Sequence, residues 1–379
     1  MSGVFSQLKN PFKLLKYSGT KYSIMHSVCI FERNISIMKR KLNIIAGALM
    51  MTAFICVPML SGCSKTKSVS TETTVEKAAK KSEAVSKDGT VETEKEAEES
   101  KLKVMASFYP MYDFAVKIGG DKVKVMDMVP AGTEPHDWEP AATDIKNLED
   151  ADVFVYSGAG MEHWVSTVLA SLENRNLVSV EASEGITLRL GHEEKEEHEG
   201  TDEDHGQYDP HVWLSPLNAK KEMENIKDAF VKADPNNQSY YEANYTEYAA
   251  KFDQLDQEYR DTISGLTNKN IVVAHEAFGY LCDAYGLKQV GIEGLSPDSE
   301  PDPAKMAEVI DFVRENHVKV IFFEELVSPK VAETIAYETG ASAEMLNPLE
   351  GLGDEELAAG EDYFSVMESN LEKLKAALE

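Results

Sequence analysis

Positive charge is scarce in this sequence. Its 379 residues include 38 Lys and Arg against 66 Asp and Glu, which gives a formal net charge of −28. Nucleic-acid binding requires clustered basic side chains that neutralise phosphates, so this composition argues against a nucleic-acid partner. An acidic chain is better suited to stay soluble and to attract cations.

Several features that identify common protein classes are also missing. Four cysteines are too few for a dense disulfide framework. No Gly-x-Gly-x-x-Gly follows an expected strand, which argues against a two-domain dinucleotide-binding enzyme, and the zinc-peptidase pattern His-Glu-x-x-His does not occur. The length and a hydrophobic fraction of 42% nevertheless suit a soluble globular protein of two or three domains.

The first 62 residues have the composition of a secretion signal. They hold eight of the 38 basic residues and a single acid. A basic Met-Lys-Arg-Lys starts at Met38, an apolar stretch covers residues 42–60, and Leu-Ser-Gly-Cys at 60–63 resembles the bacterial lipobox. We therefore expect residues 1–62 to be a signal region with its true start at Met38, and Cys63 to be lipidated. The alternative is a transmembrane helix, because the apolar stretch is nearly long enough to cross a bilayer.

Residues 63–100 are expected to be the lipidated cysteine and a disordered tether. After the cysteine they consist mainly of Ser, Thr, Lys, Glu and Ala, and they contain no aromatic residue. Such a segment cannot bury enough apolar surface to offset the entropy of ordering. The tether would let a domain that starts near Lys101 float above the membrane, held only through its lipid anchor.

The chain from Lys101 onward predicts an α/β fold with two lobes, each a parallel sheet flanked by helices. Expected strands alternate with helices in both halves. Between the halves, a long helix is predicted with one apolar stripe, formed by Tyr241, Tyr245, Tyr248, Phe252, Leu255 and Tyr259. The predicted domains are an N-terminal lobe over residues 101–235, a connecting helix over 236–267 and a C-terminal lobe over 268–379. Residues 161–172 and 355–378 are each expected to form one helix.

Three histidines and a carboxylate lie where α/β proteins place their ligands, after expected strands or just before a helix. His136 and His275 each follow an expected strand, and Glu350 follows the short strand expected at 343–346. His211 lies in Asp-Pro-His-Val-Trp-Leu, where a helix is about to begin. A single histidine at a strand end is often structural. Three in similar positions, with a carboxylate nearby, predict a tetrahedral zinc site in the cleft between the lobes.

The segments around these residues resemble a known family, the metal-binding solute receptors of ABC importers, and specifically its zinc-uptake branch. The matching segments are residues 132–140, 209–216, 275–280, 294–301 and 347–350. The resemblance covers about residues 101–379, and it implies two α/β lobes, a connecting helix and one buried metal in the cleft. It also implies that His136, His211 and His275 are metal ligands and that the fourth ligand is Glu350.

The third and fourth ligand positions decide the metal preference within this family. Manganese-binding relatives have carboxylates at both, whereas His275 supplies nitrogen, which suits Zn²⁺. Glu324 and Glu325 follow an expected strand and are rival fourth ligands, but we interpret them as an exposed strand-to-helix turn. Ser215 stands where the family commonly has Asp, which puts the contacts around the ligands in doubt more than metal binding itself.

Residues 191–209 form an acidic segment between the first two expected ligands. The segment contains His192, His198 and His205 among Asp and Glu. Its composition predicts a solvated loop and also suits weak metal capture. Zinc-specific receptors often carry such a loop at this place, so we expect these histidines to be accessory metal ligands outside the tight site.

The other candidate residues have structural interpretations. Trp138 and Trp213 each lie two residues after an expected ligand and are predicted to line the cleft or the core. His163 and His317 are expected on helices, at the surface or as caps, and Cys282 is expected to be a buried thiol.

Together these features predict an extracytoplasmic, lipid-anchored, monomeric protein that captures Zn²⁺ and delivers it to the permease of an ABC importer. The alternatives are a manganese-type receptor or surface adhesin of the same fold and, in a different class, a zinc-dependent hydrolase with Glu276 as its base. Catalytic zinc sites usually keep three protein ligands and an open water position, whereas a fourth protein ligand is available here. Zinc ligation needs neutral imidazoles, so zinc affinity is expected to fall below pH ~6.5.

Overall fold

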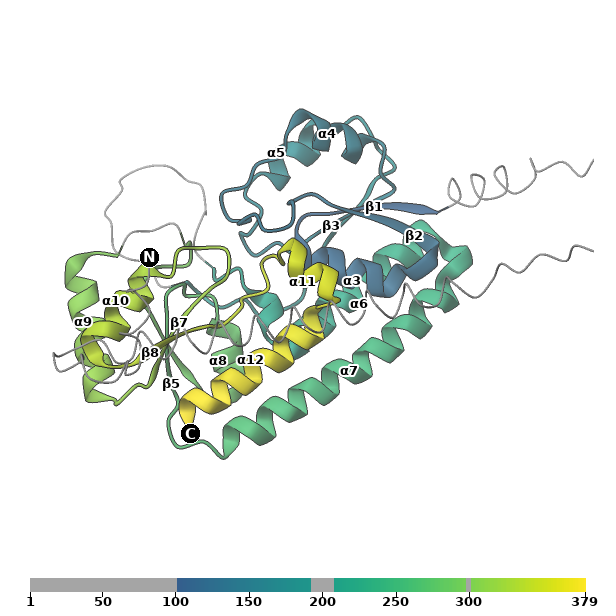
Figure 1. The fold of residues 1–379 in the computed structure, drawn as a ribbon. Helices are drawn as coiled ribbons and strands as arrows, with labels where there is room; N and C mark the ends of the chain where they lie inside the picture. Colours follow the sequence, from purple (N-terminus) through teal and green to yellow (C-terminus); the bar gives the residue numbers. More distant parts are fainter. Residues whose placement is uncertain (1–100, 192–207, 298–300) are drawn as a thin grey trace, which may run out of the picture. The chain divides into compact units, whose positions relative to one another are not determined.

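The computed structural model describes residues 101–191, 208–297 and 301–379 (Figure 1). These residues form two four-stranded sheets in which every strand pair is parallel. The predicted fold of two α/β lobes is therefore confirmed. No helix of the described segments is long and apolar enough to cross a membrane.

The first sheet has the strand order β2-β1-β3-β4. Its elements are β1 (Leu102–Ala106), α3 (Tyr109–Gly119), β2 (Val123–Asp127), α4 (Ala142–Glu149), β3 (Val153–Tyr156), α5 (Val165–Ser171), β4 (Val178–Glu181) and α6 (Pro216–Ala233). Val104 and Val155 belong to one buried cluster, and their neighbours Met105 and Phe154 belong to another. Because successive strand residues point to opposite faces, both faces of the sheet are covered. Helices α3 and α6 contribute to the first cluster, and α4 and α5 contribute to the second.

The second sheet repeats this arrangement with the order β6-β5-β7-β8. Its elements are β5 (Asn270–Val273), α8 (Gly279–Tyr285), β6 (Lys288–Gly291), α9 (Pro303–Glu315), β7 (Val320–Phe323), α10 (Lys330–Thr339) and β8 (Ser342–Met345). Val273 and Phe322 face the cluster that contains α8, whereas Val272 and Ile321 face the cluster that contains α9 and α10. The second sheet is therefore also buried on both faces.

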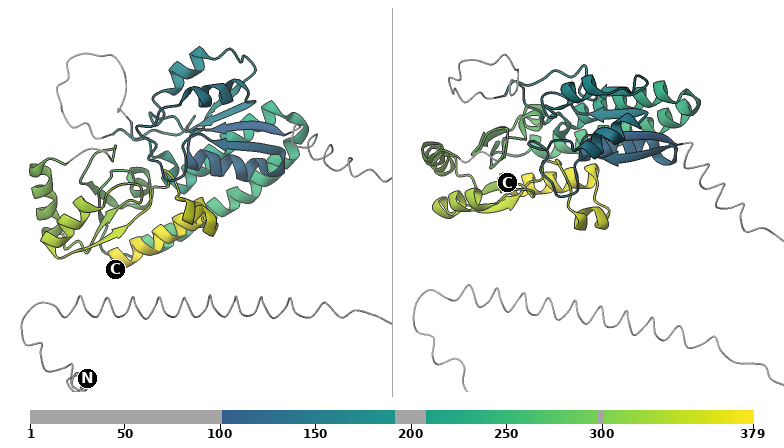
Figure 2. Two further views of the ribbon diagram at one scale, coloured as in Figure 1. Left: turned by 45° about the horizontal axis from the view of Figure 1, so that its top comes forward. Right: turned by 90° about the horizontal axis from the view of Figure 1, so that it is seen from above.

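A long helix, α7 (Gln238–Ser264), forms a wall common to both lobes. It packs against α3 and α6 of the first lobe, against α8 of the second, and alongside α12 (Tyr363–Leu378) (Figure 1 and Figure 2). The predicted stripe is buried at Tyr241, Phe252, Leu255 and Tyr259 and partly buried at Tyr245 and Tyr248. Residues of both sheets and of these helices belong to one continuous hydrophobic cluster, so the lobes share a core.

The prediction of one closing helix over residues 355–378 is wrong. The segment forms two helices, α11 (Asp354–Ala359) and α12. Gly360 ends α11 with a left-handed backbone, at φ 85°. The side chain of Asp362 then accepts a hydrogen bond from the backbone N–H of Ser365 at 3.0 Å and caps the start of α12. The chain therefore turns between the two helices.

The helix predicted over residues 161–172 is shorter than expected, because α5 begins only at Val165. The residues before it form a tight turn in which Gly158, Ala159 and Gly160 all have positive φ angles. The carboxylate of Glu162 fixes this turn by accepting hydrogen bonds from the backbone N–H groups of residues 157 and 158, at 2.8 and 2.9 Å.

Candidate metal centre

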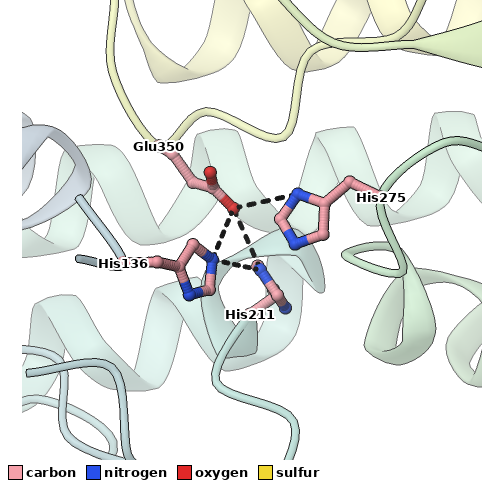
Figure 3. A group of neighbouring side chains, drawn as sticks. All are labelled: His136, His211, His275 and Glu350. Carbon is pink, nitrogen blue, oxygen red and sulfur yellow. Dashed lines mark hydrogen bonds and ion pairs between the residues drawn. The ribbon is translucent and has the colours of Figure 1, made fainter. Parts of the chain in front are cut away.

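Four side chains from separate loops converge at one point (Figure 3). His136 lies in the loop after β2, His275 lies two residues beyond the end of β5, and Glu350 lies in the loop after β8. His211 comes directly before a short 3-10 turn, Val212–Leu214, that leads into α6. One potential ligand atom of each of the four residues lies within 4.8 Å of those of the other three. The structure thus brings together the four residues predicted to be ligands, and their ligation of a metal remains a proposal.

The spacing of these atoms suits a small tetrahedral cation. Oε1 of Glu350 lies 2.9 Å from Nε2 of His211, 3.4 Å from Nε2 of His136 and 3.6 Å from Nδ1 of His275. The Nε2 atoms of His136 and His211 are 3.2 Å apart. In a tetrahedral zinc site with bonds of ~2.0–2.1 Å, neighbouring ligand atoms lie about 3.3 Å apart. Four of the separations are therefore close to tetrahedral spacing, and His275, whose ligand atom lies up to 4.8 Å from those of the other residues, would move toward them when a cation binds.

The cluster is buried, and one of its polar atoms lacks a partner. His211, His275 and Glu350 are 0%, 2% and 1% exposed, whereas the side chain of His136 is 11% exposed. Oε2 of Glu350 is buried without a hydrogen-bond partner among the described residues, and it points away from the three imidazoles (Figure 3). Burying a carboxylate without full pairing is costly, and a bound cation would offset that cost. Three nitrogens and one oxygen are also a donor set that zinc accepts.

The charges within the cluster shift its pKa values in opposite directions. Burial would raise the pKa of Glu350, but the charge of His275 and the interactions with His136 and His211 hold it well below its ordinary value. Burial lowers the pKa of His136, so this imidazole is neutral at neutral pH. Burial would also lower the pKa of His275, but the charge of Glu350 and the contact with Glu324 raise it to about 10. A metal that binds to His275 at neutral pH must therefore displace a proton.

One carboxylate contacts the imidazole of His211, and another holds the backbone of His136. Oδ1 of Asp209 lies 2.8 Å from Nδ1 of His211 and accepts a hydrogen bond from the backbone N–H of His211 at 3.1 Å. Burial lowers the pKa of His211, but the hydrogen bonds with Asp209 and Glu350 outweigh it and raise the pKa. Oε1 of Glu134 accepts a hydrogen bond from the backbone N–H of His136 at 2.9 Å. A carboxylate on Nδ1 fixes the ring so that Nε2 faces the metal, as in many zinc sites.

The interpretation of Glu324 and Glu325 as an exposed turn is wrong for Glu324. Glu324 is 5% exposed, and its Oε2 lies 2.9 Å from Nδ1 of His275. Glu325 is partly buried and accepts a hydrogen bond from Nδ2 of Asn347 at 3.0 Å. The sequence contained a signal for this position, because Glu324 directly follows β7, and β7 pairs in parallel with β5, the strand that precedes His275. The carboxyl ends of adjacent parallel strands meet at one edge of the sheet.

The two tryptophans have the structural roles that the sequence predicted. Trp213 is fully buried, and its Nε1 donates a hydrogen bond to the carbonyl of Pro348 at 2.8 Å. This bond holds the loop that carries Glu350. Trp138 is partly buried and packs edge-on against Trp164, with ring centroids 5.7 Å apart.

The prediction that His163 and His317 lie on helices is wrong, although both are exposed as expected. His163 lies in the turn before α5, and His317 follows α9 with a φ of 53°. Cys282 is a buried free thiol, as predicted. The described residues do not include Cys63, His192, His198 or His205, so the roles of these four residues stay predictions.

Comparison with known proteins gives close matches over the described part of the chain. The family model described as "Zinc-uptake complex component A periplasmic" matches residues 104–377. The high-affinity zinc uptake system protein ZnuA of Bacillus subtilis is 48% identical over 280 residues, which cover 73% of this chain and 88% of the relative. The zinc-binding lipoprotein AdcA of Streptococcus pneumoniae is 42% identical over 279 residues. That match covers 73% of this chain but only 56% of AdcA, so this chain spans about half the length of that relative.

Solved structures match over the same part of the chain. The Zn(II)-bound ZnuA-like domain of Streptococcus pneumoniae AdcA has a TM-score of 0.64 and 40% identity, and the match covers 73% of this chain and 99% of that domain. The laminin-binding protein Lmb of Streptococcus agalactiae has a TM-score of 0.65 and 34% identity, with 74% of this chain and all of that chain covered. The family model and the identity to ZnuA together show that this chain belongs to the zinc-uptake complex component A family.

Proposed function

We propose that this protein binds one Zn²⁺ through His136, His211, His275 and Glu350 and delivers it to the permease of an ABC importer. The observation that carries this proposal is the convergence of three imidazoles and one carboxylate, whose potential ligand atoms all lie within 4.8 Å of one another. Three nitrogen donors favour Zn²⁺ over Mn²⁺, which prefers oxygen ligands. The zinc-uptake names of the relatives support the same cargo.

The arrangement of the site favours binding over catalysis. Four protein side chains can saturate a tetrahedral zinc, whereas catalytic zinc sites usually keep one position open for water. Buried ligands that enclose the cation suit a carrier, which must hold its cargo until a partner takes it. A hydrolase would instead show turnover that a chelator abolishes.

We further infer that the protein acts outside the cytoplasm as a monomer anchored through a lipid on Cys63. The support is the lipobox-like sequence at residues 60–63 and the lipoprotein relative AdcA. Metabolic labelling with a fatty acid tests the anchor, because replacement of Cys63 by Ala should abolish the label. Size-exclusion chromatography with light scattering tests the monomer.

A calorimetric zinc titration of the purified protein tests the central proposal. The wild type should bind one tight equivalent, and His211→Ala should lose it because a buried ligand disappears. His317→Ala is the matched control, since this histidine is exposed and lies after α9, and it should bind as the wild type does. Tight zinc binding that survives His211→Ala, or Mn²⁺ that competes on equal terms with Zn²⁺, would contradict the proposal.

Adhesion is a second candidate function, which the structural match to Lmb favours. Lmb is described as a bifunctional protein with adhesin and metal-transporting activity. Surface plasmon resonance on immobilised laminin, with and without zinc, tests whether this chain also binds a host protein. Equal signals from laminin and from an albumin surface would exclude the adhesin function for this ligand.

A further inference from the structure

An ion-pair cluster outside the metal centre joins the segments that carry His211 and His275. At its centre is Arg189, which follows β4 in the first lobe. Its Nη1 lies 3.2 Å from Oδ2 of Asp209, and its Nε lies 3.1 Å from Oδ2 of Asp283 in α8 of the second lobe. The guanidinium group therefore bridges two carboxylates from two lobes.

The backbone around Arg189 is tied to the same helix. The backbone N–H of Arg189 donates a hydrogen bond to the hydroxyl of Tyr280 at 2.9 Å, and this hydroxyl donates to the carbonyl of Asp209 at 3.0 Å. The backbone N–H of Asp209 donates to the carbonyl of Arg189 at 2.9 Å. Side-chain and backbone contacts thus hold Arg189, Asp209 and α8 together as one unit.

The two oxygens of Asp209 serve different partners. Oδ1 holds the imidazole and the backbone N–H of His211, whereas Oδ2 pairs with Arg189. Asp209 is 0% exposed, and a buried carboxylate that loses its cationic partner is costly. The planar guanidinium group, with its fixed fork of donors, also sets the direction in which the carboxylate points. The orientation of the His211 ring therefore depends on Arg189 through Asp209.

Gly279, the first residue of α8, makes room for this ion pair. A Cβ atom at this position would lie 2.3 Å from Oδ2 of Asp209 and 2.6 Å from Nη1 of Arg189. Both distances are shorter than any ordinary contact, so the pair packs directly against the backbone of α8. Since α8 begins four residues after His275, the cluster touches both segments that lead to a histidine of the metal centre.

We propose that Arg189 is a positioning residue of the metal centre: it fixes Asp209, and thereby His211, and ties this segment to the helix that follows His275. The inference rests on the proposed zinc function. It adds a residue that lies two positions before the acidic segment of residues 191–209 and acts on His211 only through Asp209.

The test compares the zinc affinity of the full chain and its variants in competition with a chromophoric chelator. Arg189→Met should weaken zinc binding by roughly 10–100-fold, the usual effect of losing a contact behind a metal ligand. Arg260→Met removes the same charge from a half-exposed arginine that pairs with Asp256 within α7, and it should stay within about twofold of the wild type. Asp283→Asn removes only the exposed arm of the bridge and should have a smaller effect than Arg189→Met.

The visible absorption spectrum of the Co²⁺-loaded protein separates positioning from a general loss of stability. The spectrum reports the geometry of the ligands, so it should change in Arg189→Met and return toward the wild type in Arg189→Lys. If Arg189→Met does not fold, Gly279→Ala provides a second test, because its methyl group would push the ion pair apart without removing a charge. Its zinc affinity should fall and its Co²⁺ spectrum should change.

The outcomes distinguish this inference from the proposed function. A wild type that binds no zinc refutes the proposed function. A wild type that binds tightly, with Arg189→Met and Gly279→Ala equal to it in zinc affinity and Co²⁺ spectrum, refutes only the positioning role. An Arg260→Met variant that loses as much affinity as Arg189→Met would also refute it, because net charge would then explain the effect.

Discussion

Zinc binding should release a proton from His275 at neutral pH. Nδ1 of this residue lies 2.9 Å from Oε2 of Glu324, and Nε2 lies 2.9 Å from the carbonyl oxygen of Leu295. The carbonyl oxygen can only accept a hydrogen bond, and a carboxylate beside Nδ1 favours the protonated ring. The pKa of His275, raised to about 10, agrees with this state. At pH 7, removing the proton then costs about 4 kcal/mol of zinc-binding free energy.

The expected pH dependence follows from this proton. For each proton displaced, the apparent zinc association constant should rise about tenfold per pH unit, and for His275 this rise should continue until the pH approaches its pKa of about 10. The expectation from sequence alone placed the competition between protons and zinc below pH ~6.5, and the contacts of His275 extend this competition to higher pH.

The effect of pH on the stability of the zinc-free fold has the opposite sign. A raised pKa stabilises the fold fully below the unfolded value of ~6.5, and this contribution is lost as the pH rises toward about 10. The zinc-induced increase in melting temperature should therefore grow from pH ~5 upward.

Calorimetric titrations at pH 7.5 in two buffers with different protonation enthalpies count the released protons. The wild type should release about one proton more than His275→Gln, because the other histidines are common to both proteins. Glu324→Gln should lie between them, since it removes one of the groups that raise the pKa of His275. Equal proton release from the wild type and His275→Gln would refute the reasoning and indicate a neutral His275.

Three further predictions follow from the site and the core. Replacement of any one of the three histidines by Ala (His136→Ala, His211→Ala or His275→Ala) should weaken zinc binding, measured by chelator competition. The loss should exceed the roughly 10–100-fold that is typical when a contact behind a metal ligand is removed. Unchanged affinity in two of the three variants would refute the ligand assignment. Deletion of residues 192–205 should leave one tight zinc equivalent in a calorimetric titration and remove only weaker ones, because the four clustered side chains lie outside that span. Loss of the tight equivalent would place a zinc ligand in the deleted segment. Phe252→Ala should lower the free energy of unfolding by about 3–5 kcal/mol in denaturant unfolding, because the ring is 0% exposed in the shared core. The zinc stoichiometry should not change. A decrease in the free energy of unfolding below ~1 kcal/mol would contradict that burial.

The sequence predicted the candidate site better than the surroundings of the site. His136, His275 and Glu350 follow strands that hydrophobic runs identify, so their meeting at sheet edges follows from parallel topology. Glu324 has the same topological position, but a pair of glutamates before a loop is more often exposed. Its carboxylate contacts His275, a residue far away in the sequence. Local pattern cannot reveal such a long-range contact.

The closing helix was mispredicted for a different reason. Its apolar spacing continues across Gly360, and one glycine inside a helical pattern is often tolerated. The sequence did contain the stop and restart, with Gly360 at a left-handed end and Asp362 three residues before Ser365 as a cap. The long helix α7 was easier, since its apolar stripe runs without interruption, and the predicted range extends only slightly beyond the observed helix at both ends.

The shared core limits how the protein can let go of its cargo. Because one hydrophobic cluster runs through both sheets and through α7, swinging the lobes widely apart would expose apolar surface to water, at about 25 cal/mol for every Å². The loop that carries Glu350 belongs to the same core, because Leu349 and Leu352 on either side of this residue are 0% exposed within that cluster. We therefore expect the two lobes to stay closely packed while a bound ion is released, so that release depends on local changes at the ligands rather than on wide opening of the cleft.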